Sequence, residues 1–271
     1  MRNCDWLYHL KQNKYLSPMV RLGLIGFPLV HSFSPPYFEQ KIESSGLGGK
    51  VEYRPYPLRE TEDLKKWLKL RGLKGVNVTI PHKRKAAAEM DELDNWAKAA
   101  GSANTLCELS DGRWKGYNTD APGFLLTLHN ELNKFDKALV LGTGGAATAV
   151  MAALKSRGKA VNAVSSSGRG DFGYEKLQEI DFSGFGLIVN CTPLGTFPAT
   201  REAPDIPYDR LKPGQILYDL VYNPSETLFL KRGKERGCKT KNGYEMLINQ
   251  AEHSWHIWHT AFIQPQSTGK K

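Results

Sequence analysis

The chain has 271 residues and a formal net charge of +9 at pH 7, with 40% hydrophobic and 24% charged residues. That length is sufficient for two domains with a sizeable core. Apolar runs in the chain stay well short of the roughly 20 residues that cross a bilayer, and charged or polar residues interrupt the first twenty positions. We therefore expect neither a membrane anchor nor a secretory signal.

The basic residues are scattered, with short runs such as those at 83–85 and 231–232. A nucleic-acid-binding protein usually carries a basic helix with interleaved aromatics or a zinc-finger spacing, and neither pattern occurs here. The charge instead favours a small anionic substrate, with no nucleic-acid or membrane partner. The sequence leaves open whether the protein is a monomer or a homodimer.

Four cysteines, at positions 4, 107, 191 and 238, are widely spaced and form no metal-ligand pattern. This usage is typical of free thiols in a reducing compartment. We therefore expect a cytoplasmic protein without a structural metal.

The first half of the chain alternates strand and helix signals. Residues 20–26 form a short apolar run that ends in glycine, and a turn at 27–35 leads into Pro35-Pro36-Tyr37, which can open a helix. A strand is expected at 51–56, an amphipathic helix at 64–72 closed by glycine, and a further strand from Val76. The order β-α-β-α-β predicts a largely parallel sheet with helical crossovers.

The segment Val76–Lys83 reads VNVTIPHK. Period-2 alternation places Asn77 and Thr79 on one face of a strand that Pro81 should end, so that Lys83 follows just beyond. Strand ends of open α/β sheets bind ligands, and an amide, a hydroxyl and an ammonium suit a small oxygen-rich anion. The alternative is two solvated polar residues followed by a solvated basic run at 83–85.

A second strand and helix series begins near Lys137. Strands are expected at 138–141, 160–164, 186–190 and 215–220, with a helix that continues through Leu154. The pattern predicts a second βαβ unit, and the two domains should join near residues 120–136.

The first strand of this unit runs into Gly142-Thr143-Gly144-Gly145-Ala146-Ala147, which has the form G-x-G-x-x-A. The first glycine permits a tight turn, the second lets the backbone approach a pyrophosphate, and the small third position lets helix and strand pack closely. The helix N-terminus then offers free N–H groups to phosphate. The strand-turn-helix context predicts dinucleotide binding.

The residues after the next strand are Ser165-Ser166-Ser167-Gly168-Arg169. NAD enzymes often carry an acid here, which accepts from the ribose hydroxyls and would repel a 2′-phosphate. The absence of an acid and the presence of Arg169 favour NADP. The alternative is a plain loop with a solvated arginine.

Seven ordered motifs between Arg21 and about Trp258, together with a short tail pattern, resemble the shikimate dehydrogenase family, which includes quinate/shikimate dehydrogenases. The motifs are GFP with HSFSP at 26–35, NVTIPHK at 77–83, GSANTL at 101–106, GYNTD at 116–120, GTGGA at 142–146, NCTPLG at 190–195 and YDLVYNP at 218–224; the tail carries NG at 242–243, ML at 246–247 and QA at 250–251.

The resemblance implies an α/β protein of two domains with the active site in the cleft between them. Residues 20–122 plus 244–271 would form the substrate-binding domain, 123–243 a Rossmann-like NADP-binding domain, and 1–19 an extension of unknown role. The implied reaction is the reversible NADPH-dependent reduction of 3-dehydroshikimate to shikimate, in the pathway to chorismate and the aromatic amino acids.

By the same resemblance, Lys83 is the catalytic lysine and Asp120 its partner. Lys83 would act either as a base whose pKa is lowered by desolvation or a nearby cation, or as a charged group that stabilises the developing alkoxide. Asp120 could equally serve as a helix N-cap, since Asp120-Ala121-Pro122-Gly123 resembles a helix start.

The remaining site residues are also implied by the resemblance. Ser32, Ser34 and Tyr222 would contact the substrate carboxylate; Thr79, Asn104 and Gln250, with Lys83 and Asp120, would contact ring oxygens; and Asn77 belongs to the same motif. A simple helix cap is the alternative for the two serines. His31 is expected to be structural. The expected cofactor-binding residues are Gly142, Gly144, Gly145, Ala146, Ser165, Ser166, Arg169, Leu220 and Gly243.

Three histidines, His253, His256 and His259, have helical spacing in an aromatic-rich tail. Such spacing permits a metal site, but the family uses none, so we expect a packed C-terminal helix that brings Gln250 to the substrate.

The chain departs from the family at the NADP clamp, where Ser165, Ser166 and Ser167 replace the usual Asn-Arg-Thr. Arg169 is the candidate replacement, and NAD remains possible as the cofactor. The alternatives are therefore an NAD-dependent quinate/shikimate dehydrogenase and a non-catalytic sensor of dinucleotide or shikimate.

Overall fold

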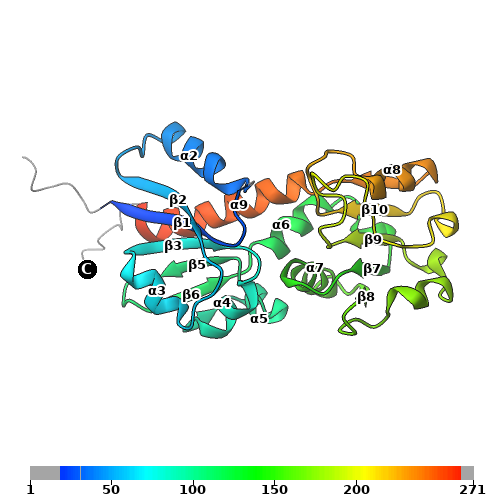
Figure 1. Ribbon diagram of the computed structural model, residues 1–271, viewed down its shortest axis with the longest axis horizontal. Coiled ribbons are helices and arrows are strands. Elements are labelled where there is room, and N and C mark those ends of the chain that lie inside the picture. Colours follow the sequence, from blue (N-terminus) through cyan, green and yellow to red (C-terminus); the bar gives the residue numbers. More distant parts are fainter. Residues whose placement is uncertain (1–18, 31, 264–271) are drawn as a thin grey trace, which may run out of the picture.

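The computed structural model describes residues 19–30 and 32–263. Two α/β units, each built on its own sheet, lie side by side along the long axis of the molecule (Figure 1). The expectations for residues 1–18 of the N-terminal extension, for His31 and for the tail at 264–271 concern residues outside this description. The two-unit α/β architecture expected from the sequence is confirmed.

The first sheet has the order β2-β1-β3-β5-β6-β4 among the described residues. β1 pairs in parallel with β2 and β3, whereas β5 is antiparallel to both β3 and β6. Its strands are β1 (Val20–Gly26), β2 (Val51–Pro57), β3 (Leu73–Val78), β4 (Glu92–Leu93), β5 (Thr105–Glu108) and β6 (Trp114–Tyr117). The helices of this unit are α2 (Ser34–Ser44), α3 (Leu64–Leu70), α4 (Lys83–Glu89) and α5 (Asn95–Ala100).

One local expectation for this unit is corrected, and one feature of it was not expected. β3 ends at Val78, so Thr79 lies in the turn beyond the strand, where the His82 amide donates to the Thr79 carbonyl at 3.0 Å. The turn contains Pro81, which has no N–H to extend a ladder. The antiparallel hairpin of β5 and β6 was not expected, because both strands are only four residues long and carry little alternation.

The second sheet is parallel throughout and has the order β11-β10-β9-β7-β8. Its strands are β7 (Lys137–Leu141), β8 (Ala160–Val164), β9 (Leu187–Asn190), β10 (Ile216–Asp219) and β11 (Lys239–Lys241). Its α-helices are α7 (Gly145–Lys155) and α8 (Leu228–Glu235), and single 3₁₀ turns are η2 (Leu132–Lys134), η3 (Tyr174–Gln178), η4 (Phe182–Gly184) and η5 (Tyr208–Arg210).

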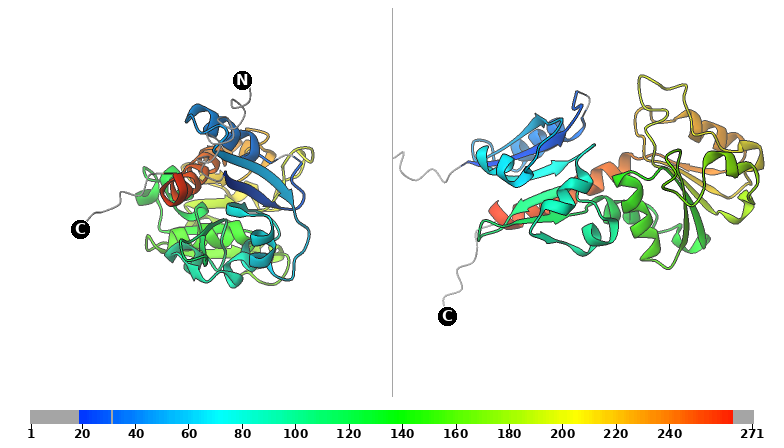
Figure 2. Two further views of the ribbon diagram at one scale, coloured as in Figure 1. Left: turned by 90° about the vertical axis from the view of Figure 1, so that its left-hand side faces the viewer. Right: turned by 60° about the horizontal axis from the view of Figure 1, so that its bottom comes forward.

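Two helices, α6 (Asp120–Thr127) and α9 (Tyr244–Trp258), run between the units (Figures 1 and 2). They pack closely because Gly123 has no side chain, and a Cβ there would lie 3.0 Å from the Gln250 amide nitrogen. At the far end of α9 the buried Trp258 donates to the Leu106 carbonyl at 3.0 Å, which fixes the helix to β5. A π-turn, η6 (His259–Ile263), follows it. The last turn of α9 thus lies against the first sheet.

None of the helices among residues 19–30 and 32–263 has the length and apolar character to cross a bilayer. Cys107, Cys191 and Cys238 carry free thiols.

Candidate active site

An ion pair between Lys83 and Asp120 forms the centre of the site. Lys83 is the first residue of α4 and Asp120 the first of α6, so both side chains project from helix starts. Lys83 Nζ lies 2.6 Å from Asp120 Oδ2, and the side chains are only 16% and 8% exposed. Thr119, not Asp120, occupies the N-cap position, so the carboxylate is available to hold the ammonium.

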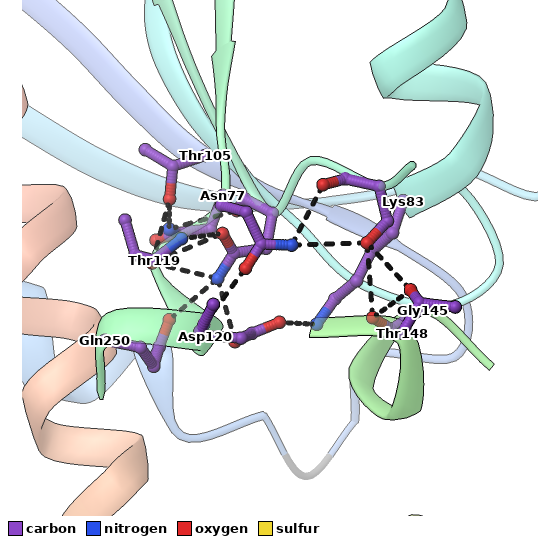
Figure 3. A network of polar contacts seen from close by, with 12 residues as sticks. Asn77, Lys83, Thr105, Thr119, Asp120, Gly145, Thr148 and Gln250 are labelled. Carbon is purple, nitrogen blue, oxygen red and sulfur yellow. Dashed lines mark hydrogen bonds and ion pairs between the residues drawn. The ribbon is translucent and has the colours of Figure 1, made fainter. Parts of the chain in front are cut away.

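Asn104 fixes the other oxygen of Asp120. Its amide nitrogen donates to Asp120 Oδ1 and to Thr119 Oγ1, each at 2.9 Å, and more weakly to Gln250 Oε1 at 3.4 Å. The Thr119 amide donates back to Asn104 Oδ1 at 2.7 Å. Figure 3 shows Asp120, at the start of α6, between Lys83 of α4 and Gln250 of α9. The structure therefore brings together Lys83, Asp120, Asn104 and Gln250.

Asn77 is buried, and its side chain is hydrogen-bonded to other groups of the protein. It accepts from the Tyr53 hydroxyl at 2.8 Å and donates to Ser254 Oγ at 3.0 Å and Thr105 Oγ1 at 3.2 Å. Burial raises the pKa of the Tyr53 phenol well above its usual value. Asn77 thus supports the network through its bonds to Ser254 and Thr105. Its direct contact with substrate stays a prediction.

Ser32 and Ser34 are half-buried on the turn that leads into α2. The N-cap of α2 is Phe33 and makes no side-chain cap bond, so the expected alternative of a serine cap is not what the structure shows. The Phe33 ring lies edge-on to Tyr222, with ring centroids 6.3 Å apart. This contact brings Tyr222, which follows β10, to the serine turn of the other unit. Thr79 is half-buried on the turn after β3.

The glycine turn of the second sheet faces this network. Gly142 has a φ of +111°, a conformation that residues with a Cβ rarely adopt, and Gly144 is the N-cap of α7 with open space where a Cβ would be. At Gly145 a Cβ would lie 3.1 Å from Lys83 Cβ, so the lysine packs against this glycine (Figure 3). Ser102 Oγ also donates to the Gly145 carbonyl at 3.2 Å. The lysine and the turn are therefore immediate neighbours.

A chain of hydroxyl groups runs from the glycine turn to Arg169. Thr143 Oγ1 lies 3.2 Å from Ser165 Oγ, which lies 2.8 Å from Ser167 Oγ. Arg169 Nε donates to Ser167 Oγ at 3.1 Å. Ser166 is exposed beside this chain. The arginine is thus held near the turn, whereas the sequence left open a freely solvated side chain.

Leu220 and Gly243 meet on the side of the second sheet near α9. Gly243 immediately precedes α9, and a Cβ there would collide with the Leu220 carbonyl. Ala146 lies in the first turn of α7. The open Gly144 face, the free amides at the start of α7 and the hydroxyl chain fit a dinucleotide whose phosphates approach backbone N–H groups.

The similarity to known proteins is extensive. Residues 24–106 match the family model described as the shikimate dehydrogenase substrate binding domain. The shikimate dehydrogenase (NADP(+)) of Desulforamulus reducens is 34% identical over 266 residues, which cover 90% of each chain. The chain belongs to the shikimate dehydrogenase family.

Solved structures of shikimate dehydrogenases agree with this membership. The enzyme of Thermus thermophilus, in complex with NADP(H) and shikimate, is 32% identical with a TM-score of 0.75, and the match covers 89% of this chain and 94% of that one. The enzyme of Listeria monocytogenes, in complex with shikimate and NAD, is 26% identical with a TM-score of 0.75, covering 89% and 92%.

Several residues of this candidate site were not expected from the sequence. Thr119 and Thr143 fall inside the motifs but only the fold shows which group each contacts. Ser254 lies four residues after Gln250 on α9, a spacing that places both on one helix face and could have suggested it. Arg84 donates across the units to the Thr143 carbonyl at 2.8 Å, a contact with no signal in the sequence.

Proposed function

We propose that this chain is an NADP-dependent shikimate dehydrogenase that reversibly reduces 3-dehydroshikimate to shikimate, on the route to chorismate and the aromatic amino acids. The observation that carries the proposal is the Lys83–Asp120 ion pair, held by Asn104 and packed against the glycine turn through Gly145. A proton-handling group is therefore adjacent to the place where a dinucleotide would bind.

The substrate would lie between the serine turn and the Asp120 network. Ser32, Ser34 and Tyr222 offer hydroxyl groups to its carboxylate, and the Phe33–Tyr222 contact supports their convergence. Thr79, Asn104 and Gln250 offer polar atoms to the ring hydroxyls. A site built to hydrogen-bond hydroxyl groups discriminates strongly against analogues that lack them.

Lys83 would hold or move the proton at the C3 oxygen of the substrate. In the reducing direction its ammonium donates to the oxygen that would otherwise become an alkoxide, and in the oxidising direction its nitrogen receives that proton. Asp120 keeps Lys83 Nζ in place, and Asn104 keeps Asp120 from rotating. A positioned acid or base of this kind typically contributes about 10²–10⁴-fold to the rate.

Bound NADPH would supply the hydride for the reduction. Gly142, Gly144, Gly145 and Ala146 would hold its diphosphate, Leu220 and Gly243 would lie beside the nicotinamide half, and Ser165, Ser166 and Arg169 would receive the 2′-phosphate. The Thr143–Ser165–Ser167 hydroxyl chain supports the last assignment, because it fixes Arg169 where the family's clamp would otherwise be.

One observation favours a second candidate function, an NAD-dependent quinate/shikimate dehydrogenase. Three serines stand in place of the Asn-Arg-Thr clamp. Serine hydroxyls can hydrogen-bond to ribose hydroxyls as well as to a phosphate. A non-catalytic sensor is disfavoured by the intact Lys83–Asp120 pair.

The wider organisation also belongs to this proposal. Residues 20–122 with 244–271 would bind the substrate and 123–243 the dinucleotide. Free thiols at the described cysteines support a cytoplasmic location. The enzyme would act on small molecules as a monomer or a homodimer.

Nicotinamide absorbance during oxidation of shikimate and quinate, each with NADP⁺ and NAD⁺, tests the proposal. We expect the largest kcat/KM for shikimate with NADP⁺. A largest value for either substrate with NAD⁺ would favour the second candidate, and binding without turnover in all four reactions would favour a sensor.

A further inference from the structure

Arg84 occupies an unusual position among the basic residues at the start of α4. Its neighbour Lys83 pairs with Asp120, and Lys85 pairs with Glu89. Within the described part of the chain, Arg84 lies within ion-pair distance of no carboxylate, and its Nη2 donates to the Thr143 carbonyl at 2.8 Å. An exposed guanidinium is therefore held against the glycine turn of the other unit.

The start of α4 is fixed firmly enough to aim this side chain. The preceding residue, His82, is buried and hydrogen-bonds the Leu58 carbonyl at 2.7 Å through Nε2. The Ala103 amide donates to the Lys83 carbonyl at 2.8 Å. Groups that bind a ligand work best on rigid supports, and Arg84 extends from one.

The contact at Thr143 has an electrostatic consequence for a bound anion. A carbonyl oxygen on a phosphate-binding turn repels negative charge, and donation from Arg84 offsets this repulsion. A guanidinium has five N–H donors, so several remain for a phosphate beside the open face of Gly144. Arginine also binds phosphate oxygens in a bidentate manner.

We propose that Arg84 binds the dinucleotide diphosphate from the opposite unit of the protein. The inference rests on the proposed NADP-dependent reaction and adds a diphosphate-binding residue to it. Arg84 and Arg169 then serve different phosphates, because Arg84 contacts the backbone of Thr143 whereas Arg169 is joined to its side chain through Ser165 and Ser167. Diphosphate binding would also draw the two units together.

Equilibrium titration of three ligands separates the two roles. NADPH carries both phosphate groups, ADP has a diphosphate without a 2′-phosphate, and 2′-AMP has a 2′-phosphate without a diphosphate. For Arg84→Met we expect the Kd of NADPH and of ADP to rise about tenfold, with the Kd of 2′-AMP unchanged. For Arg84→Lys, the Kd values of NADPH and ADP should lie between those of the unsubstituted protein and those of Arg84→Met. Lysine keeps the positive charge but lacks the paired N–H donors of a guanidinium.

Arg54→Met is the matched control, since Arg54 is an exposed arginine on the edge strand β2. It should leave all three Kd values as in the unsubstituted protein. The affinity of Arg84→Met for NADPH should also depend less steeply on salt, because one ionic contact is lost. Thermal unfolding of each variant verifies that it is folded. If Arg84→Met does not fold, the Kd values of Arg84→Lys test the inference instead.

Two results would overturn the inference alone. Unchanged NADPH and ADP binding in Arg84→Met would show that the guanidinium touches no phosphate. An equal loss for all three ligands would show that Arg84 only holds the turn in shape. If the unsubstituted protein bound none of the three, the proposed function itself would fail.

Discussion

The Asp120 network and the region of the glycine turn differ in how many hydrogen bonds their polar side chains already make within the protein. Asp120, Asn104 and Asn77 are buried and bonded to several partners each. Arg84 and Arg169 are exposed and are held by neutral oxygens. Buried, satisfied networks fix geometry, whereas unpaired cations retain charge for a ligand. The first region therefore orients reacting atoms, and the second attracts phosphate.

The largest effect is expected from removal of the Lys83 ammonium. Lys83→Met keeps a long side chain against Gly145 but removes the group that handles the proton, so kcat should fall by about 10²–10⁴. The Kd for shikimate should change little. Turnover and calorimetric binding of shikimate measure the two quantities.

Lys85→Met is the matched control for Lys83→Met, because Lys85 lies on the same helix and pairs with Glu89 instead. It should retain kcat. A kcat of Lys83→Met equal to that of the unsubstituted protein would show that Lys83 takes no part in the reaction. A loss of shikimate binding as large as the loss of kcat would show that Lys83 mainly holds the substrate.

An effect of intermediate size is expected at Arg169. In Arg169→Met the ratio of kcat/KM with NADP⁺ to that with NAD⁺ should fall about tenfold, because one charged contact to the 2′-phosphate is lost. The value with NAD⁺ itself should be retained. Arg210→Met, an exposed arginine elsewhere in the same unit that donates to the Gln178 carbonyl, should leave the ratio as it is. An unchanged ratio in Arg169→Met would separate this arginine from the cofactor.

Sequence patterns predicted the residues of the first region better than their roles. The motif at 77–83 identified Asn77, yet a side chain expected at the substrate is bonded to Tyr53 and Ser254, which come from distant parts of the chain. Local alternation also predicted that β3 extends through Ile80. The strand ends at Val78 instead, because the chain turns there and the His82 amide donates to the Thr79 carbonyl. Both features depend on tertiary contacts that spacing does not encode.

In the second region the glycine spacing predicted the turn and α7 closely, since the backbone requirement at Gly142 is local. The cross-unit contact of Arg84 was beyond prediction, because Thr143 lies 59 residues further along the chain. The anchored state of Arg169 likewise follows from the packing of Ser165 beside Thr143.

The smallest effect on activity is expected at Asp219, which is fully buried at the end of β10. Burial raises its pKa to about 6 from an ordinary value near 3.8, although hydrogen bonds from Thr227, Val221 and Asn190 oppose the shift. The folded state thus favours the protonated acid. Its contribution to stability is full below about pH 4, is lost as pH rises through about 6, and stays absent above that.

Asp219→Asn should remove this pH dependence and leave kcat largely unchanged. From pH 4 to pH 7 the free energy of unfolding of the unsubstituted protein should fall relative to that of the variant by up to about 3 kcal/mol. Urea unfolding at several pH values measures the difference. A constant difference across that range would show that Asp219 does not titrate as inferred.

The division of roles between the Asp120 network and the glycine turn is tested most directly by Asp120→Asn, assayed with shikimate and either NADP⁺ or NAD⁺. Loss of the carboxylate frees the Lys83 ammonium, so we predict that kcat/KM falls about a hundredfold with each dinucleotide. The ratio between the two dinucleotides should stay within about twofold of the unsubstituted value, because Asp120 contacts no group of the second sheet unit that would bind the 2′-phosphate. A tenfold change in that ratio would contradict the account.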